Sequence, residues 1–143
     1  NRKSGELTEK DESTQVVNWR GRGETMKEEN KEFWEALAHL VQESRIVIDR
    51  PKGTEHPSFP GCIYKVDYGY LESTTSMDGE GIDVWVGTDE ERNIDAVMCI
   101  VDLKKRDSEI KILLGCTEEE KESIYQFHNE TESMKGILIR RNV

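Results

Sequence analysis

The sequence predicts one small α+β domain whose strands form a Greek-key-like barrel. Three observations lead to this fold class. Short runs of β-branched and aromatic residues alternate with polar turns, only two segments have helical spacing, and the 143 residues are 34% hydrophobic and 35% charged. A chain of this length and polarity can build one hydrophobic core but not a second of similar size.

A disordered or weakly ordered leader is predicted for residues 1–25. This segment holds five basic and five acidic residues but only four large apolar ones, with Gly21 and Gly23 close together. Such a composition buries little apolar surface and therefore favours disorder. We expect residues 26–143 to be the folded domain, and these residues carry the whole formal net charge of −10.

Helical spacing follows the leader. Apolar side chains recur at Phe33, Leu37, Leu40 and Val41, so they share one face of a helix. Asn30 precedes this stripe, and an asparagine side chain can accept hydrogen bonds from the first free backbone N–H groups of a helix. We therefore expect an amphipathic helix that Asn30 caps.

An ordered, irregular loop is predicted after the first strand. That strand covers residues 45–50 (RIVIDR), and the segment PKGTEHPSFPG that follows it contains all three prolines of the chain. Proline fixes its own φ angle and lacks a backbone donor, so this segment can form neither a central strand nor a helix.

Five further strands are expected from the same signals. They are enriched in β-branched and aromatic residues, and polar turn residues separate them. A second helix over residues 117–130 interrupts the series, because Thr117 and Glu120 form a capping box at its start. The predicted strands cover residues 62–71, 82–87, 94–103, 109–114 and 137–139.

Composition argues against several classes of partner. A net charge of −10 does not suit nucleic acid, whose binding proteins present basic surfaces. No apolar run approaches the roughly 20 residues of a membrane-spanning helix, and no secretory signal pattern opens the chain, so no membrane partner is expected. Cys62, Cys99 and Cys116 lack metal-binding spacing, which argues against a disulfide framework or zinc site and favours the reducing cytoplasm.

Carboxylates are concentrated in the turn before residue 82. Asp78 and Glu80 lie in the glycine-rich segment SMDGEG, and Asp83 lies one step inside the next strand. Like charges at close range disfavour one another unless a cation lies between them, and hard ions such as Mg²⁺ prefer oxygen ligands. The spacing is compatible with a metal site that serves a phosphate substrate and with an ordinary solvated turn, and it does not choose between them.

The stretch YGYLESTTSMDGEGIDVWVG, residues 68–87, resembles the signature region of soluble Mg²⁺-dependent inorganic pyrophosphatases. In that family a tyrosine-rich strand leads through a turn to a D-x-D-x-x-D motif whose acids hold metal ions. A weaker resemblance extends from Ile46 to Arg141. It implies a shortened, divergent family member with a five-stranded, OB-like barrel and flanking helices. The implied activity is hydrolysis of pyrophosphate or a related phosphoanhydride, with Mg²⁺ or Mn²⁺ as cofactor.

Roles for individual residues follow from the resemblance. Asp78 and Asp83 match metal-binding acids of the motif. Glu80 stands where the family usually has an aspartate that contacts the metal and the attacking water, which makes it the candidate catalytic base.

A second part of the site is implied by DLKKRDSEIK, which resembles a compressed form of the family segment that carries two metal acids and a phosphate-binding lysine. Asp107 and Glu109 would be these acids, and Lys111 the lysine. Glu109 and Lys111 share one face of their strand because side chains alternate with a period of two. The remaining substrate-site candidates are Tyr64 and Tyr68, which match tyrosines lining the substrate site, and Asp49, which matches a strand-end acid.

Two features of the family are missing. The hairpin that normally carries a lysine, an acid and an arginine is a shorter loop, in which Lys52, His56 and Lys65 are candidate replacements. The late helix normally ends with a Tyr-Lys pair that binds phosphate, and here Glu130 and Thr131 stand instead. The alternative function is therefore a pyrophosphatase-fold protein that binds metal or phosphate, or an interaction module, without pyrophosphate turnover. The oligomeric state stays open, and a homo-oligomer is compatible with the sequence.

Overall fold

The computed structural model describes the backbone of residues 22–141 and the side chains from residue 30 onward. The chain divides between Leu37 and Ala38 into two units, which are described separately. Residues 1–21 of the predicted leader lie outside the described residues.

Helix α2 covers Arg22–Gln42 and begins well before the expected N-cap. The segment between Arg22 and Asn30 contains glutamate, methionine and lysine, which favour the helical state, and no proline interrupts it. Asn30 is consequently an interior residue of the helix, and the prediction that it caps the helix is wrong. Phe33 and Trp34 pack edge to face on α2, with ring centroids 5.3 Å apart.

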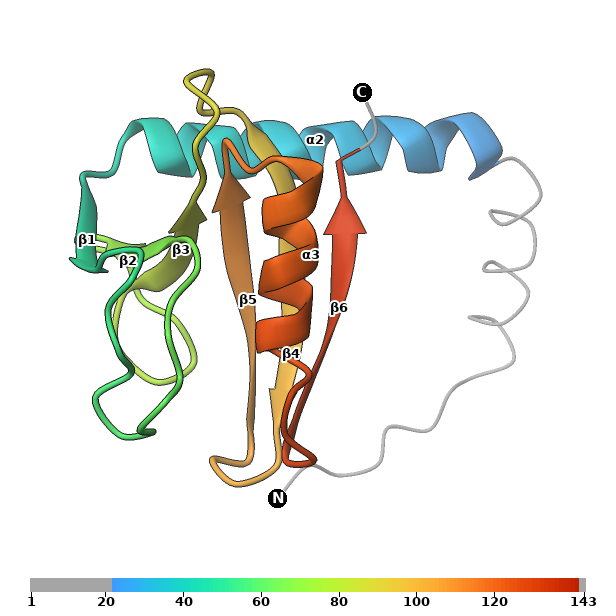
Figure 1. The fold of residues 1–143 in the computed structure, drawn as a ribbon. Helices are drawn as coiled ribbons and strands as arrows, with labels where there is room; N and C mark the ends of the chain where they lie inside the picture. Colours follow the sequence, from blue (N-terminus) through green and yellow to red (C-terminus); the bar gives the residue numbers. More distant parts are fainter. Residues whose placement is uncertain (1–21, 142–143) are drawn as a thin grey trace, which may run out of the picture. The chain divides into compact units, whose positions relative to one another are not determined.

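The unit from Ala38 onward is a mixed six-stranded sheet with one helix, α3 (Figure 1). The elements are β1 (Ile46–Arg50), β2 (Asp67–Leu71), β3 (Ile82–Val86), β4 (Ile94–Asp102), β5 (Asp107–Leu114), α3 (Glu118–Phe127) and β6 (Met134–Arg140). The strand order is β1-β2-β3-β5-β4-β6. The α+β class and six strands are thus confirmed. In the described part of the chain β1 and β6 are separate edges, so the sheet is not closed and a five-stranded, OB-like barrel is not confirmed.

The order of the central strands positions the site. The chain leaves β3, forms β4 two places away, and returns as β5 between them, so β3 and β5 run parallel. Val84 pairs with Ile112 in this register, which makes Asp83 and Lys111 neighbours on adjacent strands. Residues far apart in the sequence are brought together by this arrangement.

One face of the sheet forms the core with α3 (Figure 1). Trp85, Leu113 and Ile124 are buried there, and the Trp85 indole N–H donates to Nε2 of His128 at 3.1 Å. The predicted capping box of Thr117 is confirmed at the start of α3. The hydrogen bond to His128 therefore fixes the C-terminal end of α3 to β3.

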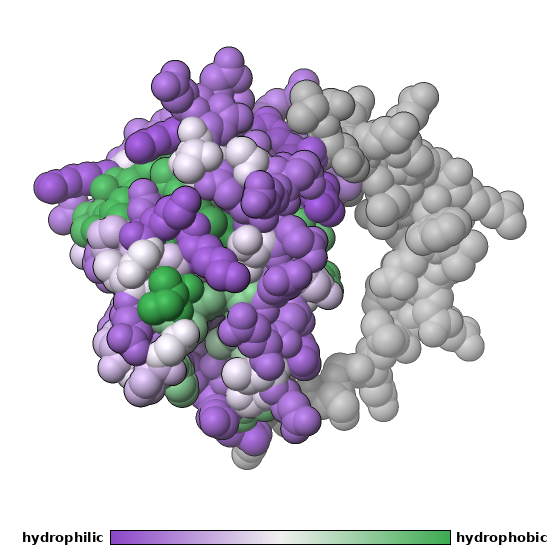
Figure 2. Space-filling view, in the orientation of Figure 1, coloured by the Kyte–Doolittle hydropathy of each residue, from purple (hydrophilic) through white to green (hydrophobic). Residues whose placement is uncertain are grey.

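The surface around this core is strongly polar. Hydrophilic residues cover most of the face shown in Figure 2, with smaller apolar areas between them. Neither α2 nor α3, the helices of the described residues, is long and apolar enough to span a bilayer.

Candidate functional site

Four of the predicted site residues meet at the ammonium group of Lys111, a buried residue of β5. Its Nζ donates to Oδ2 of Asp83 at 2.7 Å and to the hydroxyl of Tyr68 at 2.6 Å. The same nitrogen lies 3.5 Å from Oε2 of Glu109. The Tyr68 hydroxyl in turn donates to Oδ2 of Asp83 at 2.6 Å. Strands β2, β3 and β5 therefore supply one connected polar cluster, here called the Lys111 cluster: Tyr68, Asp83, Glu109 and Lys111.

Asp78, on the turn before β3, is near enough to Glu109 for each to affect the pKa of the other. Burial opposes the ionisation of Asp78, but hydrogen bonds from the Glu80 backbone N–H and the Ser76 hydroxyl lower its pKa. Burial raises the pKa of Glu109, and the negative charges of Asp78 and Asp83 add to this effect against the opposing charge of Lys111. The acids Asp78, Asp83 and Glu109 thus lie close enough to influence one another's ionisation.

These carboxyl groups fit a hard divalent cation in chemical type. Asp78, Asp83 and Glu109 offer only oxygen ligands, and Oε1 of Glu109 is buried without a hydrogen-bond partner among the described residues. A bound cation would satisfy such an oxygen. Among the described side chains, no three His, Cys, Asp or Glu residues are already arranged to hold a metal ion. In this structure the positive charge beside them comes from Lys111.

Three predicted site residues are not brought into the Lys111 cluster. Glu80 is exposed on the turn, Asp49 is exposed on β1, and Asp107 is half-buried at the start of β5, opposite Asp102 of β4. Across the described side chains, no hydrogen bond or ion pair links these three carboxylates to Lys111 or Asp83. Their roles stay predictions.

Tyr64 lies in an aromatic layer next to the Lys111 cluster. Its ring centroid is 5.4 Å from that of Tyr68, and His56 stacks on it at 6.0 Å. Its hydroxyl accepts a hydrogen bond from the guanidinium of Arg50, which also lies over the Tyr68 ring at 5.7 Å. Arg50 is not among the predicted site residues, although its guanidinium carbon lies 5.6 Å from the ring centroid of Tyr64 and 5.7 Å from that of Tyr68.

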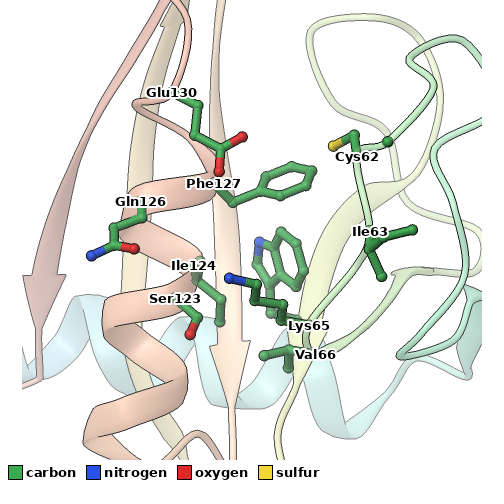
Figure 3. Close-up of a pocket in the computed structure, with 11 residues that line it drawn as sticks. Cys62, Ile63, Lys65, Val66, Ser123, Ile124, Gln126, Phe127 and Glu130 are labelled. Carbon is green, nitrogen blue, oxygen red and sulfur yellow. The ribbon is translucent and has the colours of Figure 1, made fainter.

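A separate pocket of about 250 Å³ lies between α3 and the segment that precedes β2 (Figure 3). Its lining includes the aromatic residues Trp85 and Phe127 and the charged residues Lys65 and Glu130. Burial, followed by the charge of Glu130, raises the pKa of the Cys62 thiol in the same pocket. None of the carboxylates around Lys111 lines it. Lys65 and Glu130 therefore face this pocket and not the Lys111 cluster.

Comparison with known proteins gives one family. The family model described as Inorganic Pyrophosphatase matches residues 41–140, which is most of the chain. No curated protein matches it.

Solved structures with a similar chain path include three bacterial proteins. The inorganic pyrophosphatase of Coxiella burnetii is 16% identical with a TM-score of 0.47, and the match covers 71% of this chain and 80% of that one. The inorganic pyrophosphatase of Neisseria gonorrhoeae is 16% identical with a TM-score of 0.45, covering 67% and 73%. A protein of Anaplasma phagocytophilum described as an inorganic phosphatase is 15% identical with a TM-score of 0.43, covering 68% and 74%.

Proposed function

This chain belongs to the inorganic pyrophosphatase family, and from that premise we propose that it hydrolyses pyrophosphate, or a closely related phosphoanhydride, with Mg²⁺ or Mn²⁺ as cofactor. The observation that supports the proposal most is the convergence of Tyr68, Asp83, Glu109 and Lys111 from three strands on one point. Residues 26–143 are proposed as the catalytic domain, and the cytoplasm as its location.

Each residue of the Lys111 cluster has a proposed role. Asp78, Asp83 and Glu109 would hold the cation, with Asp107 as a further ligand. When bound, a divalent cation supplies Lewis acidity toward phosphoryl oxygens and water. Lys111 would bind a phosphoryl oxygen through the ammonium that now contacts Asp83.

Three further residues would border the substrate. The Tyr68 hydroxyl is proposed to orient the substrate, and Tyr64 to line the same space. Asp49, exposed at the end of β1, is proposed to act at the outer edge of the site.

Glu80 is proposed as the base, from an exposed position between two glycines. Gly79 has a φ of +82°, which favours glycine, and a Cβ on Gly81 would lie 2.8 Å from the carbonyl oxygen of Leu71. The turn is thus built around glycine on both sides of Glu80. This backbone can carry the longer side chain in the place of the family's aspartate.

A second candidate function is metal or phosphate binding without pyrophosphate turnover. It is favoured by Glu80, whose side chain has no described contact with the Lys111 cluster. It is also favoured by Glu130, which lines the separate pocket and stands where the family has its Tyr-Lys pair. Hydrolysis needs cations that stabilise charge on both phosphoryl groups, and a site with fewer of them can still bind.

Phosphate release by the purified full chain separates the two candidates. Pyrophosphate, nucleotides and short polyphosphates are incubated with Mg²⁺ or Mn²⁺, and wild type is compared with Asp83→Asn and with Glu90→Gln. Glu90→Gln removes one negative charge, as Asp83→Asn does, but on an exposed loop after β3. Metal-dependent turnover that only Asp83→Asn abolishes supports the hydrolase. If no phosphate is released but calorimetry still detects Mn²⁺ binding, the result supports a binding protein without turnover.

A further inference from the structure

We propose that Arg50 is a second phosphate-binding cation of this site and that a β-bulge in β1 delivers it. The inference rests on the proposed function, since it concerns the substrate of the same site. A diphosphate carries charge on both of its phosphoryl groups, and the Lys111 cluster contains one cation. The sequence lacks the family's hairpin with its lysine and arginine, so binding of the second phosphoryl group requires another cation.

The pairing of β1 with β2 shows how Arg50 reaches the site. Ile48 pairs with Gly69, but the next pair is Arg50 with Tyr68, so Asp49 is an extra residue without a partner. Directly opposed residues of an antiparallel pair point to the same face of a sheet. Strict alternation would place Asp49 beside Tyr68 and Arg50 on the opposite face with Ile48. The bulge reverses this and turns Arg50 to the face of Tyr68.

Arg50 and Lys111 border the same tyrosine. The Arg50 guanidinium carbon lies 5.7 Å and the Lys111 ammonium 5.1 Å from the Tyr68 ring centroid. The guanidinium is half-buried, and among the described side chains Tyr64 is its one hydrogen-bond partner. A guanidinium has five N–H donors arranged in a planar fork, so most of these donors are free to bind an anion. The planar fork matches two phosphate oxygens, as a lysine ammonium does not.

Further positive charge gathers beside Arg50. Burial lowers the pKa of His56, and the charges of Arg50 and Lys105 lower it further. Lys105, on the turn between β4 and β5, is also among the groups that favour the ionised form of Asp78. Arg50 and Lys105 therefore both act as positive charges on His56. An anionic substrate beside Tyr68 would meet cations from β1 and β5.

A purely structural role for Arg50 predicts something different. If Arg50 only fixes the Tyr64 hydroxyl, its replacement should lower stability and leave ligand affinity unchanged. If it binds phosphate, affinity should fall, and so should the dependence of affinity on salt, because one cationic contact is lost. Affinity and stability must therefore be measured on the same variants.

The test uses methylenediphosphonate, a pyrophosphate analogue that cannot be hydrolysed, titrated into the full chain with Mg²⁺ by calorimetry. Arg50→Gln should weaken binding by about 10-fold or more and flatten its salt dependence. Arg50→Lys keeps the charge but loses the fork, and it should weaken binding by about 3-fold or more. The control is Arg45→Gln at the other end of β1, where Arg45 lies 3.9 Å from Glu72 and away from the tyrosines. It should bind as wild type does, and melting temperatures are recorded throughout.

Each outcome decides the inference. If Arg50→Gln binds methylenediphosphonate with wild-type affinity, the inference is overturned, whatever the melting temperature of the variant. If Arg50→Gln does not fold, Arg50→Lys decides in the same way, since unchanged affinity in that variant excludes recognition by the fork. Wild-type binding that needs Arg50, without pyrophosphate turnover, overturns the hydrolase while the role of Arg50 stands. A wild-type protein that binds no analogue overturns both proposals.

Discussion

The ammonium group of Lys111 lies 2.7 Å from the carboxylate of Asp83, and the two residues come from the neighbouring parallel strands β5 and β3. Their side chains are only 10% and 23% exposed, so solvent screens the pair weakly. When a buried ion pair loses one partner, an uncompensated charge stays behind in the interior. Lys111 therefore stabilises the carboxylates of the site in addition to its proposed role toward the substrate.

Lys111→Ala is expected to lower the free energy of unfolding by about 3 kcal/mol in metal-free buffer, because Asp83 and Glu109 lose their cation. Mg²⁺ or Mn²⁺ should restore part of this stability, and more so in the variant than in wild type, since a divalent ion can neutralise the same carboxylates. Urea unfolding with and without metal measures both effects. Lys104→Ala, on the exposed β4–β5 turn, is the control. If metal does not stabilise Lys111→Ala, the carboxylates are not its ligands.

His128 predicts a pH dependence of stability. Burial, followed by the charge of Lys111, lowers the pKa of His128 from 6.5 to about 3. Between about pH 6.5 and pH 3, His128 is therefore protonated in the unfolded chain but neutral in the folded chain. Stability is complete above pH 6.5 and should fall as the pH drops through this window, by up to about 1.4 kcal/mol per pH unit.

The variant His128→Gln tests this dependence. Glutamine keeps an acceptor for the Trp85 indole N–H but does not titrate, so stability should change less between pH 7 and pH 5 than in wild type. Urea midpoints at the two pH values give the comparison. His39→Gln, which replaces an exposed histidine of α2, should retain the wild-type slope. Equal slopes in wild type and His128→Gln would show that His128 is accessible to protons in the folded state.

Gly69 tests the close approach of β1 and β2. A Cβ atom at this position would lie 1.9 Å from the backbone oxygen of Val47, and a backbone cannot yield as a side chain does. Gly69→Ala should lower the free energy of unfolding by about 4 kcal/mol. In Gly136→Ala the new atom would meet the flexible end of Met98 at 2.7 Å, so a loss of about 1 kcal/mol is expected. Thermal unfolding of both variants measures the difference, and similar losses would contradict the tight β1–β2 pairing.

The sequence predicts much of the fold and part of the site. Alternating β-branched residues locate the strands, and the period of two puts Glu109 and Lys111 on one face, as the structure confirms. The parallel pairing of β3 with β5, which brings Asp83 to Lys111, depends on long-range contacts that no local pattern encodes. Helix α2 begins earlier than the sequence pattern predicts, because good helix formers continue upstream of Asn30 without a stop signal.

Arg50 shows where periodicity misleads. Its alternation with Ile46 and Ile48 would assign it to the face away from Tyr68, whereas Asp49 is a site candidate through the family resemblance. A bulge is a property of the pairing between two strands, so it cannot be read from one of them. The signal that was present is the strand end at Pro51, where regular pairing stops.

The Glu80 side chain is exposed, while the Glu80 backbone N–H donates to Asp78 at 2.9 Å. A glutamate reaches about 1.5 Å further than an aspartate, and catalytic geometry tolerates misplacement of about 1 Å poorly. If the glycines on both sides have shifted the turn to suit the longer chain, Glu80→Gln should abolish pyrophosphate hydrolysis. Glu80→Asp should then remain at least about 10-fold slower than wild type.

The matched control for Glu80 is Glu72→Gln, which removes an exposed carboxylate just after β2. It should leave the rate of phosphate release unchanged, because Glu72 pairs with Arg45 at the far end of β1. A crystal structure with Mn²⁺ supplies the geometric test. Mn²⁺ bound by Asp78 and Asp83, with the Glu80 carboxylate turned to solvent, would contradict its role as base. The protein would then bind metal and phosphate without this residue's help, as the second candidate function requires.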